Sequence, residues 1–419
     1  MPPLPTPVSL APVSPAPSPV PLPVLGADIT VPVTGNRTVP YANLDIAATA
    51  PCAVSAADAV NRLLPSYASV HRGAGVLSAR CTQAYEQARE TVCRFLGCRP
   101  GDEVVFTRNT TDALNLLAGA VPADTVVVTF VAEHHANLLP WRTVVRLPLP
   151  SSPDEAVAAI DQALHRHGPA LVAITAASNV TGEVWPVADI ARVARRHGAR
   201  VAVDAAQLAA HQPVSLADLD VDYIAVSGHK LYAPFGAGVL AGRADWLDAA
   251  QPYLRGGGAS TQVNSVGTAS WAVGPARHEA GTPNLLGAVA LAAVCAALTP
   301  LHWKALLVQE QHLLGELRAG LAAVPGVREL RLFAPEHPRV GIVSFTIDGL
   351  DSAQVARRLA DEHGIGVRAG LFCAHPLTRH LLDAHTAAPS TAIRASLGAG
   401  TSGEHVHRLV TAVRAIATP

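Results

Sequence analysis

The chain has 419 residues, a net charge of −1 and only 15% charged residues. A chain of this length can bury one large hydrophobic core and a smaller one. It carries no basic run that would neutralise nucleic-acid phosphates or bind an anionic membrane, so neither class of partner is expected. The six cysteines (52, 81, 93, 98, 295 and 373) form no CxxC pair, so no metal site or disulfide framework is expected. The expected compartment is therefore a reducing cytoplasm.

The N-terminal 38 residues differ in composition from the rest. Ten prolines fall within the first 24 positions, and no basic region precedes an unbroken apolar stretch as in a secretory signal. Proline at this density favours extended, solvated chain, so we expect residues 1–38 to be a disordered leader. The most apolar helical stretch, residues 285–298, is shorter than the roughly 20 residues that span a bilayer, which predicts a buried helix.

From about residue 100 the chain alternates short runs rich in valine and isoleucine with longer amphipathic runs. Apolar strands that alternate with helices predict a mainly parallel sheet with both faces covered. Such sheets bind ligands at the carboxyl ends of their strands. The expected strands are 103–107, 125–130, 171–175, 201–204, 223–226 and 238–241, and the expected helices are 111–120, 153–167 and 187–197.

The pattern changes after Pro300 and predicts a smaller α/β lobe. A long helix is followed by strands and helices without the strict alternation of the preceding part. The expected helices are 301–323, 352–363 and 402–416, and the expected strands are 341–347, 365–368 and 392–397.

Lys230 is one of two lysines in the chain, against 29 arginines, and it follows a predicted strand in the sequence Ser227-Gly228-His229-Lys230. Arginine replaces lysine in solvation and ion pairing, but its guanidinium stays protonated and cannot form a Schiff base. A lysine retained at the end of a strand is therefore a candidate for covalent amine chemistry. The alternative, a surface lysine that escaped replacement, fits Lys304, which lies in a helix-like stretch.

Two further strand ends carry groups that suit pyridoxal phosphate (PLP). Asp204 ends its strand, and a carboxylate there can pair with the protonated ring nitrogen that makes this cofactor an electron sink. Gln207 follows about one turn later and could donate to the phenolic oxygen of the ring. Thr110 and Thr111 follow the strand expected over 103–107 and stand at the start of the helix expected over 111–120, where hydroxyls and free N–H groups bind anions such as phosphate. Each feature alone is equally typical of a helix cap.

Two other polar segments complete the set. His134, in Glu133-His134-His135, follows a predicted strand and could stack on an aromatic ring. Ser227 and His229 flank the lysine and could reach a phosphate, although a polar loop that only caps the strand has the same composition. The shared position of these groups at the carboxyl ends of strands favours one cofactor site.

These segments resemble the class V aminotransferase-fold PLP enzymes, and among them the group II cysteine desulfurases and selenocysteine lyases. The resemblance runs from about residue 41 to the C-terminus and is more specific for fold and cofactor than for reaction. It is carried by Glu133-His134-His135-Ala-Asn-Leu-Leu-Pro-Trp141, Asp204-Ala-Ala-Gln207, Ser227-Gly-His-Lys230, Arg277-His-Glu-Ala-Gly-Thr282, Arg368-Ala-Gly-Leu-Phe-Cys373 and Ile393-Arg394.

The resemblance implies a PLP-dependent transferase of fold type I, with a large domain built on a mainly parallel sheet and a smaller C-terminal α/β domain. It divides the chain into the leader 1–38, a segment 39–65 that packs with the small domain, the PLP-binding domain 66–299 and the small domain 300–419. It further implies a homodimer with active sites at the interface, a small amino-acid substrate and, for a desulfurase, a sulfur-acceptor protein.

The resemblance also implies a role for each site residue. Lys230 forms the imine with PLP and moves the substrate proton, and His134 stacks over the ring. The other cofactor contacts are Thr110, Thr111, Asp204, Gln207, Ser227, His229 and, from the neighbouring subunit, Thr282. Asn179 and Arg394 bind the substrate carboxylate, a task that suits the planar guanidinium of arginine.

Cys373 decides between reactions. The resemblance implies that it attacks the substrate sulfur and becomes a persulfide, which requires a thiolate in a partly exposed loop. The desulfurase pattern has His-His before this cysteine, whereas Leu371 and Phe372 stand here and remove a possible proton partner. The alternatives are therefore a class V aminotransferase, an epimerase or a C–S lyase acting on another amino acid. A catalytically silent binding protein with the same fold is a further alternative.

Overall fold

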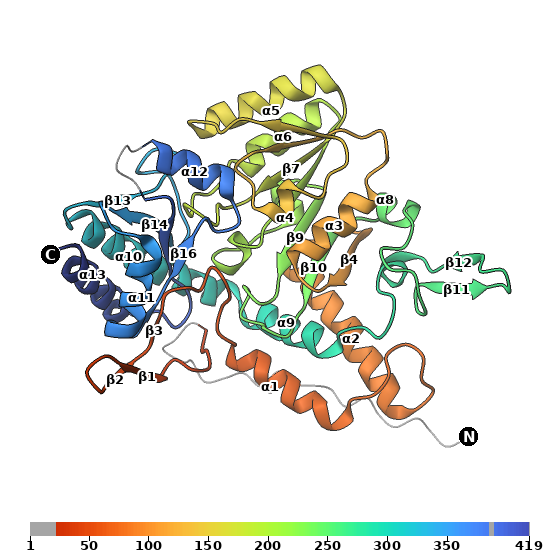
Figure 1. Cartoon of the computed structure of the whole chain (residues 1–419). Coiled ribbons are helices and arrows are strands. Elements are labelled where there is room, and N and C mark those ends of the chain that lie inside the picture. Colours follow the sequence, from red (N-terminus) through yellow and green to blue (C-terminus); the bar gives the residue numbers. More distant parts are fainter. Residues whose placement is uncertain (1–21, 385–388, 419) are drawn as a thin grey trace.

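The computed structural model describes residues 22–384 and 389–418 and has a large α/β body and a smaller C-terminal lobe (Figure 1). The body is built on a seven-stranded sheet with the order β4-β10-β9-β8-β7-β5-β6. Strands β5 to β9 are mutually parallel, and β10 is antiparallel to both of its neighbours. The predicted mainly parallel sheet is thus confirmed. Its strands are β4 (Asp102–Thr107), β5 (Val127–Phe130), β6 (Val144–Leu147), β7 (Leu171–Thr175), β8 (Arg200–Asp204), β9 (Tyr223–Ser227) and β10 (Gly238–Arg243).

Both faces of this sheet are covered because alternate residues of each strand point to opposite sides. In β8, Val201 and Val203 enter the larger core, while Ala202 enters the core on the opposite face. The larger core is shared with helices α1 (Val54–Leu63), α2 (Val76–Phe95), α5 (Pro153–His167), α6 (Val187–Arg196), α7 (Leu216–Leu219) and α9 (Leu285–Ala297). The opposite face is covered by α3 (Thr110–Ala120), α4 (His135–Leu138) and α8 (Ala244–Ala249).

The C-terminal lobe has its own core around a four-stranded antiparallel sheet with the order β13-β14-β17-β16. The strands are β13 (Val327–Glu329), β14 (Ile342–Ile347), β16 (Arg368–Gly370) and β17 (Ala392–Ser396). Helices α10 (Pro300–Ala322), α11 (Ser352–His363) and α13 (Gly403–Ala417) pack against it, and α12 (His375–Asp383) lies between the lobe and the body (Figure 1). The strand expected over 365–368 is divided, because β15 (Ile365–Gly366) pairs with β3 (Ala42–Asn43) instead of this sheet.

The predicted leader is too long at its C-terminal end. Residues 22–38 belong to the described fold: Leu22 is buried, and β1 (Thr30–Val33) pairs with β2 (Arg37–Pro40). Gly35 and Asn36 adopt positive φ angles of 82° and 57°, which allow the tight turn between these strands. The proline-rich composition masked this short β-branched hairpin in the sequence. Residues 1–21, which hold nine of the ten prolines among the first 24 positions, lie outside the described residues.

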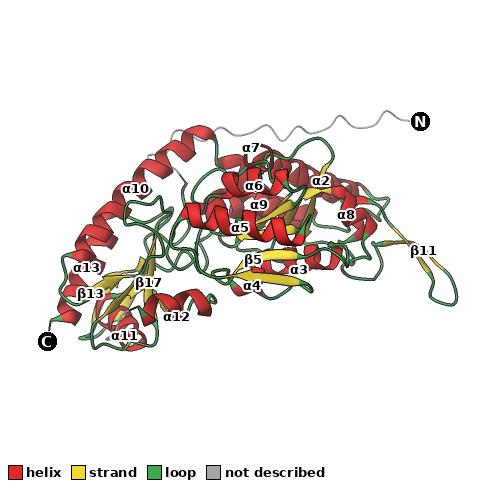
Figure 2. Cartoon of the chain, turned by 90° about the horizontal axis from the view of Figure 1, so that it is seen from above, coloured by secondary structure: helices red, strands yellow, loops and turns green. Residues whose placement is uncertain are grey.

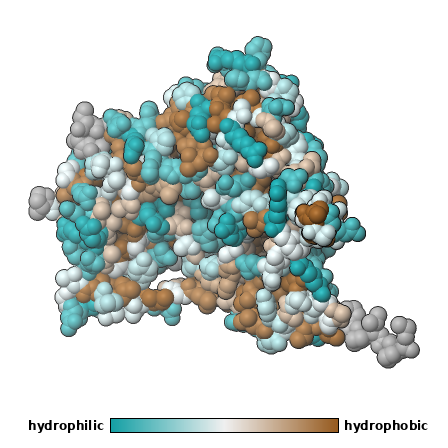
Figure 3. Space-filling model, turned by 45° about the vertical axis from the view of Figure 1, so that its right-hand side comes forward, coloured by the Kyte–Doolittle hydropathy of each residue, from teal (hydrophilic) through white to brown (hydrophobic). Residues whose placement is uncertain are grey.

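A second hairpin extends from the body on the side away from the C-terminal lobe (Figure 2). It consists of β11 (Ser260–Val263) and β12 (Ala269–Trp271), and it exposes 61% of Val263 and 82% of Val266. No charged residue occurs between Arg255 and Arg277. On the face of the molecule that carries this hairpin, apolar residues form separate patches among polar ones (Figure 3).

Among the described helices, none alone has the length and apolar composition of a membrane span. The consecutive helices α9 and α10 have this length and apolar composition only when they are taken together, and a bend of 81° separates them. Most residues of α9 are buried inside the body, as the sequence predicted for residues 285–298.

Candidate active site

A cavity of about 510 Å³ lies at the carboxyl ends of the parallel strands, where the body meets the C-terminal lobe. All but one of the candidate residues line it. They are Thr110, Thr111, His134, Asn179, Asp204, Gln207, Ser227, His229, Lys230, Cys373 and Arg394. The exception is Thr282.

Lys230 follows β9 directly and faces this cavity. Gly228 makes the turn possible, because a Cβ atom there would lie 2.5 Å from the carbonyl oxygen of Ala237. The pKa of Lys230 is lowered to about 8, mainly by burial and also by the charge of Arg394, while Asp204 and Cys373 oppose the shift. A lysine with a depressed pKa is more readily neutral, the state that a nucleophilic amine or a general base requires.

Asp204 ends β8 and is almost fully buried. Its Oδ1 accepts a 3.0 Å hydrogen bond from the backbone N–H of Ala206, which fixes the carboxylate at the cavity wall. Burial raises the pKa of Asp204, and the Ala206 hydrogen bond and the charge of Lys230 act against the rise. Gln207 is also buried, and its amide donates to the carbonyl oxygen of Ala47. The N-terminal segment thus forms part of the wall.

The N-terminus of α3 forms one end of the cavity. The side chain of Asn109 caps this helix by accepting from the N–H of Asp112. The Oγ of Ser227 accepts from the N–H of Thr110 and lies 2.8 Å from its Oγ1, so the end of β9 and the start of α3 are joined. The approach requires Gly238, because a Cβ atom there would lie 2.5 Å from the Cα of Asn109. Hydroxyls and helix N–H groups therefore converge here as an anion site requires.

His134 precedes α4 and caps it, since its Nδ1 accepts from the N–H of Ala136 at 3.0 Å. A neutral imidazole that accepts at Nδ1 carries its proton at Nε2. Burial lowers the pKa of His134 to about 3, and the charges of Lys230, His135 and Arg394 contribute. The ring is therefore held neutral, in one tautomer, at the wall of the cavity.

Arg394 on β17 forms the opposite end. It is 3% exposed, donates to the carbonyl oxygen of Asn179 at 3.0 Å, and reaches Oδ1 of Asp45 at 3.2 Å. The ring of Phe372 lies 5.2 Å from its guanidinium carbon. Its Nε has no hydrogen-bond partner in the described part of the chain. A buried guanidinium with a free donor, beside the amide of Asn179, suits a small carboxylate.

Cys373 lies in an exposed loop that the structure fixes at several points. Phe372 and Cys373 have positive φ angles of 54° and 55°. The Phe372 carbonyl oxygen accepts from Asn179 Nδ2 at 2.6 Å, and that of Cys373 accepts from the N–H of His135 at 2.8 Å. Two successive side chains in the left-handed region are strained, and such strain is maintained only by surrounding contacts. Cys295, in contrast, is buried, and burial raises the pKa of its thiol.

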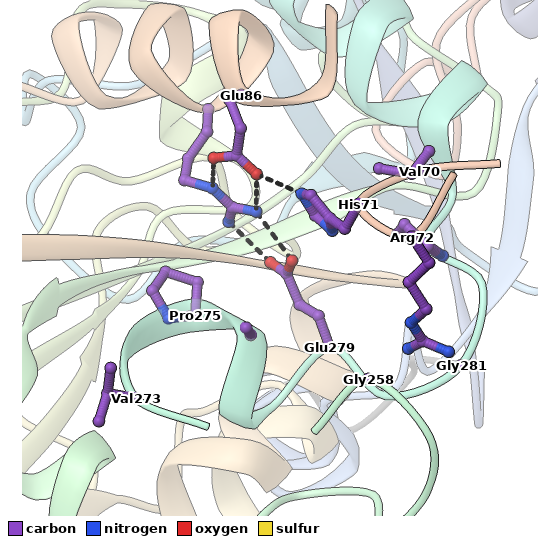
Figure 4. Close-up of a pocket in the computed structure, with 12 residues that line it drawn as sticks. Val70, His71, Arg72, Glu86, Gly258, Val273, Pro275, Glu279 and Gly281 are labelled. Atoms are coloured by element: carbon purple, nitrogen blue, oxygen red, sulfur yellow. Dashed lines mark hydrogen bonds and ion pairs between the residues drawn. The ribbon is translucent and has the colours of Figure 1, made fainter. Parts of the chain in front are cut away.

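Thr282 is exposed and lies between Gly281 and Pro283, which line a separate cavity of about 280 Å³ (Figure 4). Arg89 pairs there with Glu279 at 2.7 Å and with Glu86 at 2.9 Å, and His71 also contacts Glu86. Within one chain, Thr282 is therefore not among the residues that line the Lys230 cavity.

The sequence did not single out four residues that the structure brings to the cavity or its wall. Asp45 holds Arg394 and also Arg368, which lies at the mouth. Glu133 is fully buried and accepts from the N–H of Thr175 and from the side chain of Asn137. His375 lines the cavity and meets His135 edge to face. For the histidines, the sequence signal was that His375 lies two residues after Cys373 and His135 directly follows His134. The contacts themselves join distant segments, so no local pattern predicts them.

Comparison with known proteins places the chain in a family. The family model described as Aminotransferase class-V matches residues 42–409. The chain belongs to the class-V aminotransferase family. The expected PLP-dependent enzyme family and fold type I are thereby confirmed.

Curated class-V relatives cover nearly the whole chain. A cysteine desulfurase from Dickeya dadantii is 36% identical over 392 residues, covering 90% of this chain and 92% of the relative. A cysteine desulfurase from Escherichia coli is 35% identical over 392 residues, covering 90% of this chain and 94% of the relative.

Solved structures of similar proteins agree. The apo cysteine desulfurase from Thermococcus onnurineus has a TM-score of 0.79 at 31% identity, covering 90% of this chain and 94% of its own. The S-sulfonic acid form of the cysteine desulfurase CsdA from Escherichia coli has a TM-score of 0.76 at 32% identity, covering 89% and 94%.

The residues present fit PLP. The cavity offers an amine with a depressed pKa, a buried carboxylate near it, and hydroxyl and N–H donors at a helix N-terminus. These groups match the aldehyde, the ring nitrogen and the phosphate of this cofactor. The Nε of Arg394, which has no partner among the described residues, could donate to a second ligand.

Proposed function

We propose that the chain is a PLP-dependent cysteine desulfurase that converts L-cysteine, or selenocysteine, to alanine and leaves a persulfide on Cys373. The observation that carries this proposal is one cavity that contains Lys230, Asp204, Arg394 and an exposed cysteine. The relatives named cysteine desulfurase support the same reaction, and no comparison favours transamination, epimerisation or a catalytically silent protein.

Lys230 would hold PLP through its amine, and Asp204 would keep the ring nitrogen protonated. Thr110, Thr111, Ser227 and His229 would hold the phosphate. When bound, PLP supplies an electron sink that makes the α-proton of an amino acid acidic. Lys230 is placed to take that proton, because its lowered pKa favours the neutral amine.

The substrate carboxylate would bind Arg394 and Asn179. The free Nε of Arg394 and the second N–H of the Asn179 amide are available without breaking the existing contacts. Asp45 and Phe372 fix the guanidinium before the substrate arrives, which reduces the entropy cost of binding. His134, held neutral, would pack against the ring and orient it.

Cys373 would attack the γ-sulfur of the substrate. The S–S bond forms as the Cβ–S bond breaks, the thiol loses one hydrogen, and the methyl group of alanine gains one, so atoms and charge balance. Access from outside suits the next step, transfer of the terminal sulfur to an acceptor protein. The requirement for a reduced thiol supports a cytoplasmic location.

The position of Thr282 supports the proposal of a homodimer. Its exposed hydroxyl lies outside the Lys230 cavity, so a second copy would have to bring it to the phosphate. The projecting β11–β12 hairpin (Figure 2), with exposed Val263 and Val266, supports a subunit contact through this segment. We retain the division into a segment 39–65, a PLP-binding domain 66–299 and a small domain 300–419 as part of this proposal.

Incubation with L-cysteine, PLP and a reductant tests the reaction through stoichiometric alanine and sulfide. Cys373→Ala should lose both products while the cofactor absorbance stays unchanged, and Cys295→Ala is the matched control. If Cys373→Ala forms alanine at the wild-type rate, Cys373 is not the sulfur acceptor. If the wild type makes a keto acid or inverts the α-carbon, the desulfurase assignment is wrong.

A further inference from the structure

The residues directly before Cys373 provide no proton acceptor. Leu371 and Phe372 are apolar, and the ring of Phe372 covers Arg394. His134 has its Nδ1 occupied by the Ala136 N–H. A persulfide-forming cysteine must lose its proton, because the thiolate is the nucleophile. The acceptor therefore has to come from another part of the cavity.

Two histidines meet at this point from different elements. His375 begins α12, two residues after Cys373, and His135 begins α4. Their ring centroids are 4.4 Å apart at an interplanar angle of 73°, an edge-to-face contact. The backbone N–H of His135 donates to the carbonyl oxygen of Cys373, so His135 is joined to the loop that carries the cysteine. Cys373 and His375 also line the same cavity.

We propose that His375, supported by His135, is the proton partner of Cys373. This inference rests on the proposed desulfurase function. The His375 imidazole accepts the thiol proton as the Cys373 sulfur attacks, and the resulting imidazolium is stabilised by its contact with the His135 ring. Because His375 is exposed, it exchanges its proton with water between turnovers. No oxidant or reductant is needed.

Other charges also act on the thiol and remain in every variant below. Lys230, Arg394 and Arg368 are cationic groups around the loop, and Asp45 partly neutralises the two arginines. These charges are the same in every variant, whereas substitution of His375 removes a group that can accept a proton.

The test measures alkylation of Cys373 by iodoacetamide in the holoenzyme between pH 5.5 and 9, with peptide mass spectrometry to resolve this cysteine from the others. His375→Gln should lower the rate at pH 7 by about fivefold to tenfold and move the profile toward the roughly 8.5 of a free thiol. His135→Gln, in which His375 remains, should give a smaller change in the same direction. His380→Gln, which changes an exposed histidine on the same helix, should leave the profile unchanged.

In turnover, His375→Gln should lower kcat for alanine formation and move the acidic limb of the pH profile, with KM for cysteine unchanged. Identical alkylation profiles in the wild type, His375→Gln and His135→Gln would overturn the proposal. The alkylation readout does not depend on turnover. A wild type that alkylates as predicted but forms no alanine would therefore contradict the proposed function and not the histidine pair.

Discussion

Glu133 is a fully buried carboxyl group that forms no ion pair with any described residue, and its removal should change how stability depends on pH. Its Oε1 accepts from the N–H of Thr175 at 3.0 Å and its Oε2 accepts from Asn137 Nδ2 at 2.8 Å. Burial raises the pKa of Glu133 from 4.5 to about 8, the charge of Asp204 adds to the rise, and the two hydrogen bonds oppose it.

The direction of the effect follows from which state binds the proton. Below about pH 4.5 both the folded and the unfolded chain are protonated at this residue, so it contributes no slope. Between about pH 4.5 and 8 the unfolded chain releases the proton and the folded chain keeps it, so the free energy of unfolding falls as pH rises. The shift of about 3.5 units (8 minus 4.5) sets an upper limit of about 5 kcal/mol, at about 1.36 kcal/mol per unit.

Glu133→Gln removes this titration while it preserves the shape. The glutamine oxygen can accept from Thr175, and its amide can donate to Asn137 Oδ1, which has no partner among the described residues. The variant should therefore gain stability relative to the wild type as pH rises from 5 to 8. Urea unfolding followed by far-UV circular dichroism at several pH values measures this, with the exposed Glu90→Gln as the matched control. Parallel pH profiles for the wild type and Glu133→Gln would refute the reasoning.

Two further predictions concern buried charges. Glu183→Gln should lower the free energy of unfolding by about 3–5 kcal/mol, because Arg339 is 4% exposed and loses one of its two carboxylate partners. Glu362→Gln, at an exposed pair, should stay near the wild type. Urea unfolding of both variants measures the difference, and equal stabilities would contradict the prediction. Asp204→Asn should retain PLP but lower kcat about 100-fold and shift the visible absorbance band, since the ring nitrogen loses its anionic partner; an unchanged band and rate would remove Asp204 from the site.

The body of the fold was predictable because its signals are local. Unbroken apolar runs identified the parallel strands β5, β7, β8 and β9, and most of their observed bounds differ from the expected ones by one or two residues, but the sequence analysis missed the parallel strand β6. Asp204 and Lys230 could be placed together because Asp204 ends one such run and Lys230 lies shortly after another. The carboxyl ends of neighbouring parallel strands lie at the same edge of the sheet.

The remaining features depend on contacts between distant segments. Asp45 holds Arg394 across 349 residues of sequence, and Gln207 donates to Ala47 across 160. No local pattern encodes such pairs. The meeting of His135 with His375 likewise requires the turn at Phe372 and Cys373, where non-glycine residues adopt positive φ angles. The β1–β2 hairpin was missed for another reason, since its short strands adjoin a proline-rich segment.

The most direct test of the whole account is the bond between Lys230 and PLP. Borohydride reduction of the holoenzyme, followed by digestion and mass spectrometry, should find a pyridoxyl group on the peptide that contains Lys230, and Lys304 should be unmodified. Lys230→Ala should lose the visible absorbance band. An adduct on Lys304, or a purified protein that binds no PLP, would contradict the catalytic role assigned to this cavity.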